Sequence, residues 1–160
     1  MPFPSILIAN NILQLAFRDD RHVCPPKLNR ILWFTACEYA KTGRGPLLPE
    51  QFEPWSRGPV ARSVHGKFGV FGAAPINVYG KDAAGKAHVV DLSRNSELSA
   101  VISEVWEKTS VYTPNVLSDV ATWPGSAWWN ATANKDRYIT ADALAADTSY
   151  VKMLDLPASR

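Results

Sequence analysis

The segment from Pro25 to Ala40 constrains the fold most, because its apolar side chains follow a helical spacing yet leave no wholly polar face. Pro25 and Pro26 suit the first helical turn, where a missing N–H is tolerated, and Gly43 suits a left-handed helix stop. A helix that is apolar nearly all round is buried among other elements. We therefore expect this helix to be the central one. Its apolar positions are Leu28, Ile31, Leu32, Phe34, Cys37, Tyr39 and Ala40.

Length and composition indicate an ordinary globular chain. The sequence has 160 residues, of which 46% are hydrophobic and 20% charged. Such a chain can bury a core without a metal or disulfide staple, so we expect one domain over residues 1–160. A formal net charge of +2 is too balanced to indicate nucleic-acid binding. The N-terminus lacks a basic n-region and a cleavage site, and no apolar run is long enough to span a membrane, so we expect a cytoplasmic protein.

The remaining patterns predict a mainly α (α+β) fold, a compact bundle of about six helices with one small β-hairpin. Helices are predicted at residues 6–17, from Pro59 to near Gly69 or Gly72, from a Ser93 or Ser96 cap to Trp106, and from a Thr113 cap to a stop at Trp123-Pro124-Gly125. A short turn at residues 128–133 and a Thr140-capped segment through Ala146 follow. Residues 76–79 and 88–91 flank a polar turn and predict the hairpin.

No motif of an enzyme or a metal site occurs in the sequence. Phosphate-binding loops, zinc-protease helices, nucleophile elbows and paired cysteines are all missing. Cys24 and Cys37 are isolated from each other, and we expect Cys37 to lie in the core. We assign no catalytic residue, no metal ligand and no cofactor. A catalytic constellation built from scattered residues stays open, because such sites are defined by geometry rather than by order in the chain.

Six tryptophans are the unusual feature of the composition. Trp33, Trp106 and Trp128 fall in or beside helical patterns, and we expect them to pack. The other three have a competing reading as interface anchors, because tryptophan and arginine are enriched at interface hot spots. The candidate partner-binding residues are Trp55, Arg57, Arg62, Trp123 and Trp129.

Two blocks of the sequence resemble the Panacea domain of SocA-like antitoxins and GepA-like phage-associated proteins. The first block comprises Lys27-Leu28-x-x-x-Leu32, Thr42-Gly43, Pro46-Leu47 and Glu50-x-Phe52-Glu53-x-Trp55-x-x-Gly58-Pro59-Val60, followed by Val64, Phe68 and Gly72. The second is LSDVATWPGSAWWNA, residues 117–131, which includes Trp128. The resemblance covers most of the chain. Two positions depart from it: the usual Thr-His is Ala121-Thr122, and Arg62 replaces a frequent proline.

The resemblance implies an antitoxin that neutralises a protein toxin encoded in the same operon by direct binding. Some relatives act as adaptors that deliver the toxin to a protease, such as a AAA+ protease. The residues shared with the family are read as architecture, namely Lys27, Leu32, Gly43, Phe52, Gly58, Pro59, Val60 and Trp128. Arg57 and Arg62 occupy variable places and are better candidates for partner choice. An enzyme that uses an unassigned polar cleft and a phage-encoded regulator of host proteins remain as alternatives.

Overall fold

The computed structural model describes residues 1–157, which form eight α-helices and one two-stranded antiparallel hairpin. The mainly α class with a small hairpin is therefore confirmed, although the helices are more numerous than about six because the last third of the chain forms three short ones. The elements in chain order are α1 (Ser5–Arg18), α2 (Pro25–Ala40), β1 (Glu53–Trp55), β2 (Gly58–Val60), α3 (Arg62–Phe68), the 3-10 turns η1 (Gly69–Phe71) and η2 (Leu92–Arg94), α4 (Ser96–Thr109), α5 (Pro114–Ala121), α6 (Ala127–Ala133), α7 (Ala141–Ala146) and α8 (Val151–Leu154).

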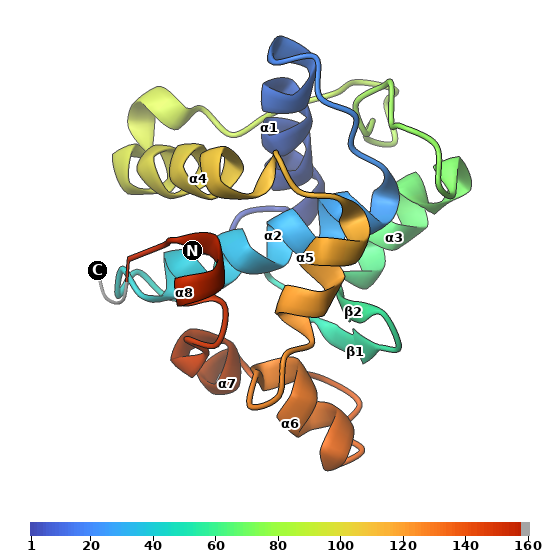
Figure 1. Cartoon of the computed structure of the whole chain (residues 1–160). Helices are drawn as coiled ribbons and strands as arrows, with labels where there is room; N and C mark the ends of the chain where they lie inside the picture. Colours follow the sequence, from blue (N-terminus) through green and yellow to red (C-terminus); the bar gives the residue numbers. More distant parts are fainter. Residues whose placement is uncertain (158–160) are drawn as a thin grey trace.

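Helix α2 runs through the middle of the molecule, as its all-round apolar pattern predicts (Figure 1). Helices α1 and α4 pack on one side of it, whereas α5 and α7 pack on the other. Every residue from Lys27 to Tyr39 is buried. Leu32 and Trp33 have no exposed surface, and Trp33 meets the ring of Phe52 edge-on with 5.0 Å between centroids. Helix α2 is thus the element against which the others pack.

Helix caps hold the later helices at the predicted residues. The Thr113 and Thr140 hydroxyls accept from the backbone N–H groups of Val116 and Ala143, which fixes the starts of α5 and α7. Pro114 occupies the first turn of α5. Helix α4 begins at Ser96, but its N-cap is Asn95 rather than either predicted serine.

The hairpin lies in a different place from the predicted one. Residues 76–79 and 88–91 form no strand pair, and an isolated bridge between Lys81 and Ala87 is their nearest pairing. The side chain of Asn10 accepts from the Gly80 N–H at 2.8 Å and donates to the Gly80 and His88 carbonyls at 2.9 Å each. Asn11 binds both backbone groups of Val90 in the same way, at 2.8 and 3.0 Å. The segment therefore hydrogen-bonds to α1 side chains at Gly80, His88 and Val90, and it pairs with itself at the polar turn, where the Asp82 N–H donates to the Lys86 carbonyl at 2.8 Å.

The observed hairpin occupies the Phe52–Gly58 region and corrects the role given to Pro59. Pro59 lies in β2 opposite Pro54, so it does not open a helix, and α3 begins three residues later at Arg62. Two prolines can face each other here because neither has an N–H to donate. The Ala61 N–H, at the N-cap of α3, donates to the Asn29 Oδ1 at 3.0 Å. The first turn of α3 therefore begins at Arg62 and not at Pro59.

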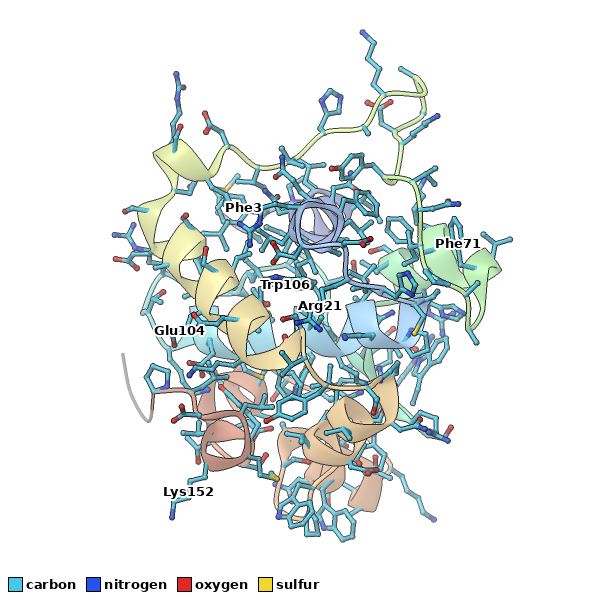
Figure 2. The ribbon with its side chains drawn as sticks, turned by 45° about the horizontal axis from the view of Figure 1, so that its top comes forward. Phe3, Arg21, Phe71, Glu104, Trp106 and Lys152 are labelled. Carbon is cyan, nitrogen blue, oxygen red and sulfur yellow. The ribbon has the colours of Figure 1, made fainter. Side chains whose placement is uncertain are left out.

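One hydrophobic cluster joins the helices and includes Trp106 at 3% exposure. Figure 2, with α1 seen nearly end-on, shows Trp106 close to α1. Its Nε1 donates to the Asp19 Oδ2 at 2.7 Å, which ties α4 to the end of α1. The packing prediction is confirmed for Trp33, Trp106 and Cys37. Within residues 1–157, no helix is both long and apolar enough to span a membrane.

Candidate functional site

A cleft of about 530 Å³ opens between the start of α2, the turn of the hairpin, the end of α3 and the start of α5. Its lining carries two arginines, one histidine and no aspartate or glutamate. Most of the other walls are apolar. The lining residues are Cys24, Pro25, Pro26, Asn29, Arg30, Trp55, Ser56, Arg57, Val60, His65, Gly69, Gly72, Ala73, Pro114, Asn115 and Ser118.

Arg30 lies at the base of this cleft and is 2% exposed. Its Nε donates to the Ser118 Oγ at 3.2 Å, and its Nη1 donates to the Pro59 carbonyl at 2.8 Å. These bonds join α2 to α5 and to β2. Burial, with a smaller contribution from Arg57, lowers the pKa of the Arg30 guanidinium to about 10, so it is still a cation at neutral pH.

No carboxylate among the described residues forms an ion pair with Arg30. The Nη2 of Arg30 has no hydrogen-bond acceptor among residues 1–157. Sequence reasoning missed this residue, because one arginine inside an apolar helix gives no motif. The one sequence feature that could have pointed to it is Gly58, because the absence of a side chain there leaves room for the Arg30 guanidinium.

Arg57 is the second cation of the cleft, and it lies in the two-residue turn between the strands. Its Nη2 donates to the Asn115 Oδ1 at 2.8 Å, in the first turn of α5. Its side chain is exposed, and within residues 1–157 it has no acidic partner. Arg57 therefore places a positive charge at the mouth of the cleft.

Trp55 and His65 form an aromatic wall of the cleft, with ring centroids 4.7 Å apart. The Trp55 Nε1 donates to the Glu53 Oε1 at 3.1 Å. Glu53 also accepts two hydrogen bonds from Arg62, at 2.7 and 2.9 Å. These Arg62 bonds, with a smaller contribution from Trp55, lower the pKa of the Glu53 carboxyl. Arg62 is thus held by the hairpin, and it does not line the cleft.

The predicted partner-binding residues lie in three places. Trp55 and Arg57 line the cleft, whereas Arg62 binds Glu53 and lies 5.8 Å from the centre of the Trp55 ring. Trp123 and Trp129 are absent from the lining and lie around the turn between α5 and α6, 51% and 46% exposed. The neighbouring Trp128, in contrast, has a structural role. Trp128 is half-buried, and its Nε1 donates to the Trp55 carbonyl at 2.7 Å.

The residues that the sequence shares with the resembled family make contacts that stabilise the fold. The buried Lys27 donates from Nζ to the Ser110 carbonyl at 2.7 Å, and burial lowers the pKa of its ammonium. The Phe52 carbonyl accepts from the Ile139 N–H at 2.8 Å, which fastens β1 to the chain before α7. Val60 is buried, and Gly43 has a φ of +80° just after α2.

Thr122, which stands where the resembled family has histidine, is also engaged locally. Its Oγ1 donates to the Ser118 carbonyl at 2.8 Å, at the end of α5.

A hydrogen-bond network lies at the end of α2, where the buried Glu38 accepts a short hydrogen bond from the Tyr150 hydroxyl and Lys41 donates to that hydroxyl at 2.9 Å. This network joins the end of α2 to the start of α8, and it does not line the cleft at Arg30.

The described residues contain no group of three or more His, Cys, Asp or Glu side chains that could hold a metal ion. Cys24 is the half-buried thiol of the cleft, whereas Cys37 is fully buried.

Comparison with models of known families, with curated proteins and with solved structures gives no match. The arrangement of the cleft is suited to binding a negatively charged group, because two arginines line it and no aspartate or glutamate does.

Proposed function

We propose that this protein is an antitoxin-type binding module, which neutralises a co-encoded protein toxin by direct contact. The observation that carries the proposal is the pair of exposed tryptophans at the α5–α6 turn, Trp123 and Trp129, at 51% and 46% exposure. A tryptophan contributes about 150–250 Å² of buried surface when it is covered, and tryptophan is the residue type most typical of interface hot spots. Two exposed tryptophans, one just after α5 and one in the first turn of α6, favour a protein partner.

Hydrogen bonds hold the backbone between Trp123 and Trp129, which supports the same role. Ser126 is fully buried, its N–H donates to the Trp123 carbonyl at 2.9 Å, and its Oγ accepts from the Trp129 N–H at 3.0 Å. The Ala127 N–H donates to the Asp147 Oδ2 at 3.0 Å. Because the backbone around both anchors is already held, its ordering costs little when a partner binds, and more of the contact energy remains as affinity.

The antitoxin class itself comes from the Panacea-like blocks of the sequence, and the exposed tryptophans lie within the second block. In this proposal, rescue from the toxin follows from occlusion of its surface. Delivery of the bound toxin to a AAA+ protease is a further step that the same complex would allow.

The experiment is to co-express the chain with the product of the neighbouring gene, and to compare growth rescue and co-purification between variants. Trp123→Ala combined with Trp129→Ala should weaken the complex about thirtyfold or more, because the loss of a single hot-spot residue already costs about 2 kcal/mol or more. The melting temperature should stay close to that of the wild type, because both side chains are exposed. Tyr112→Ala, at an exposed aromatic residue between α4 and α5, is the matched control and should keep full rescue.

The proposal fails in its present form if the double variant rescues growth and co-purifies with the partner as well as the wild type does. It also fails if the double variant loses rescue only because it no longer folds, which circular dichroism of the purified variant measures.

A further inference from the structure

The cleft at Arg30 holds a positive charge that the described part of the chain leaves uncompensated. A charged side chain that is taken out of water costs several kcal/mol unless a counter-charge and hydrogen bonds offset the lost hydration. Arg30 is 2% exposed and has two hydrogen bonds, both to neutral oxygens. The remaining nitrogen, Nη2, has no acceptor among residues 1–157, and Arg30 is one of the residues that line the cleft. A bound anion would supply the missing compensation.

We propose that this cleft binds a small planar organic oxyanion, with its carboxylate or phosphate group between Arg30 and Arg57 and its planar part against Trp55. This binding site is distinct from the tryptophan pair at the α5–α6 turn, and it does not depend on the antitoxin proposal. Arginine is suited to the task because its planar fork of N–H donors matches carboxylate and phosphate oxygens.

The geometry pre-orients Arg30 for such a ligand. The bonds from Nε to Ser118 and from Nη1 to Pro59 fix the plane of the guanidinium before any ligand arrives. Gly58 packs so closely against the same group that a Cβ there would lie 2.5 Å from the Arg30 Nε. A guanidinium fixed on two edges and one face loses little freedom when it binds an anion.

The other charged side chain and the helix ends that line the cleft also favour an anion, and the nearby Glu53 carboxylate, behind Trp55, is paired with Arg62. Arg57 lies at the mouth, and no aspartate or glutamate occurs in the lining. Two helices, α2 and α5, begin at this cleft, with Pro25 and Pro114 in their first turns. The N-terminal end of a helix carries a partial positive charge, so both dipoles add to the attraction for an anion.

Size and apolarity indicate the rest of the ligand. A volume of about 530 Å³ lies inside the range of about 300–1,000 Å³ that small-molecule sites occupy. The walls include Pro25, Pro26, Val60 and Pro114 beside the Trp55 ring. This combination fits a molecule with one anionic group on a flat apolar body, such as an aromatic carboxylate or a mononucleotide.

The test is to titrate the purified full chain with benzoate and with AMP at constant ionic strength, by calorimetry and by thermal shift. The neutral matched probes are benzamide and adenosine. We expect saturable binding and a rise in melting temperature with at least one of the anions, and no binding of its neutral counterpart. Benzoate alone would identify a carboxylate ligand, whereas AMP alone would identify a phosphate ligand.

Two variants separate a real site from a general attraction of anions to a basic surface. Arg57→Gln should weaken binding about tenfold or more, because a charge-assisted hydrogen bond contributes about 1.5–3 kcal/mol. Arg94→Gln is the control at a highly exposed arginine outside the lining, and it should bind like the wild type.

A second readout does not depend on folding energy. Cys24 lines the cleft and Cys37 is fully buried, so a thiol reagent should modify Cys24 first in the native protein. The anion that binds should slow this modification several-fold, and its neutral counterpart should not. The inference is overturned if neither anion binds saturably, or if Arg57→Gln binds as tightly as Arg94→Gln.

Discussion

Gly58 and Arg30 fit together at the residue scale, and this contact explains a glycine that the sequence marks only as part of a turn. Gly58 has a φ of +140°, which side-chain-bearing residues rarely adopt. A Cβ at this position would lie 2.5 Å from the Arg30 Nε and 2.8 Å from its Cζ. The guanidinium cannot move away freely, because it is hydrogen-bonded to Pro59 and Ser118. Backbone strain and steric contact therefore act together here.

Gly58→Ala should lower the free energy of unfolding by roughly 2–4 kcal/mol, through strain at a positive φ and overpacking against Arg30. Gly85→Ala is the matched control, because its φ of +79° is also positive but a Cβ added there would have no neighbouring atom within 4 Å. That variant should lose only about 1 kcal/mol. Urea denaturation of both variants gives the comparison. Equal losses would show that the contact with Arg30 contributes nothing.

Asp19 makes the free energy of unfolding depend on pH under acidic conditions. The Arg18 hydrogen bonds, followed by the bond from Trp106, lower the pKa of the Asp19 carboxyl to about 2. An unfolded aspartate titrates near 3.9, so the folded state prefers the ionised form. The stability that Asp19 contributes is therefore present above about pH 4, and it is lost as the pH falls toward 2.

We expect Asp19→Asn to lose less stability than the wild type between pH 5 and pH 2, since its amide does not titrate but can still accept from the Trp106 Nε1. Unfolding by urea at a series of pH values measures this difference. Parallel curves for the two proteins would contradict the assignment of the low pKa to Asp19.

At the element scale, α1 side chains hold the two ends of residues 80–90. The alternating pattern around the polar turn is typical of a hairpin, but the buried amides of Asn10 and Asn11 bind the backbone of Gly80, His88 and Val90. A side-chain amide carries one donor group and one acceptor, as the edge of a strand does. The sequence pattern could not reveal this, because the two asparagines lie about 70 residues or more before their partners.

Asn10→Ala should release this segment from α1. The change leaves the Gly80 N–H and two carbonyls without partners, and we expect a loss of about 2–3 kcal/mol. Limited proteolysis should cut residues 80–90 faster in this variant than in the wild type. Gln14→Ala, at an exposed position of the same helix, is the control and should be cut at the wild-type rate. Unchanged proteolysis in Asn10→Ala would mean that other contacts hold the segment.

Local signals predicted the elements that depend on local chemistry. The prolines at Pro25 and Pro114 and the caps at Thr113 and Thr140 mark helix starts that the structure has. Pro59 was misread because a proline after glycine suits a strand edge as well as a helix start. The choice between the two depends on partners from α2, namely Asn29 and Arg30.

At the scale of the whole molecule, the burial of α2 determines the arrangement of the other helices. Leu32 has no exposed surface, and helices pack on both sides of the helix that carries it (Figure 1). The candidate cleft is assembled from the start of this helix together with α5, α3 and the hairpin. Trp55 and Arg57 could be chosen as site residues from the sequence, whereas Arg30, Asn115 and Ser118 become neighbours only when these elements pack.

Leu32→Asp should abolish the cooperative thermal transition, because an unpaired carboxylate buried in this position costs several kcal/mol, comparable with the stability of a domain of this size. Val70→Asp is the control at an exposed apolar residue, and it should melt like the wild type. Circular dichroism on heating measures both. A cooperative melt near the wild-type temperature for Leu32→Asp would contradict the central position of α2.

The most direct test of the proposed function is the stoichiometry of rescue. The chain and the product of the neighbouring gene are co-expressed at graded ratios, growth is recorded, and the mass of the purified material is measured by light scattering. Direct neutralisation predicts a co-purifying complex of the two chains and rescue that rises until the antitoxin matches the toxin. Rescue at strongly substoichiometric amounts, with no complex and no protease required, would contradict it and indicate an enzyme that acts on the toxin or its product.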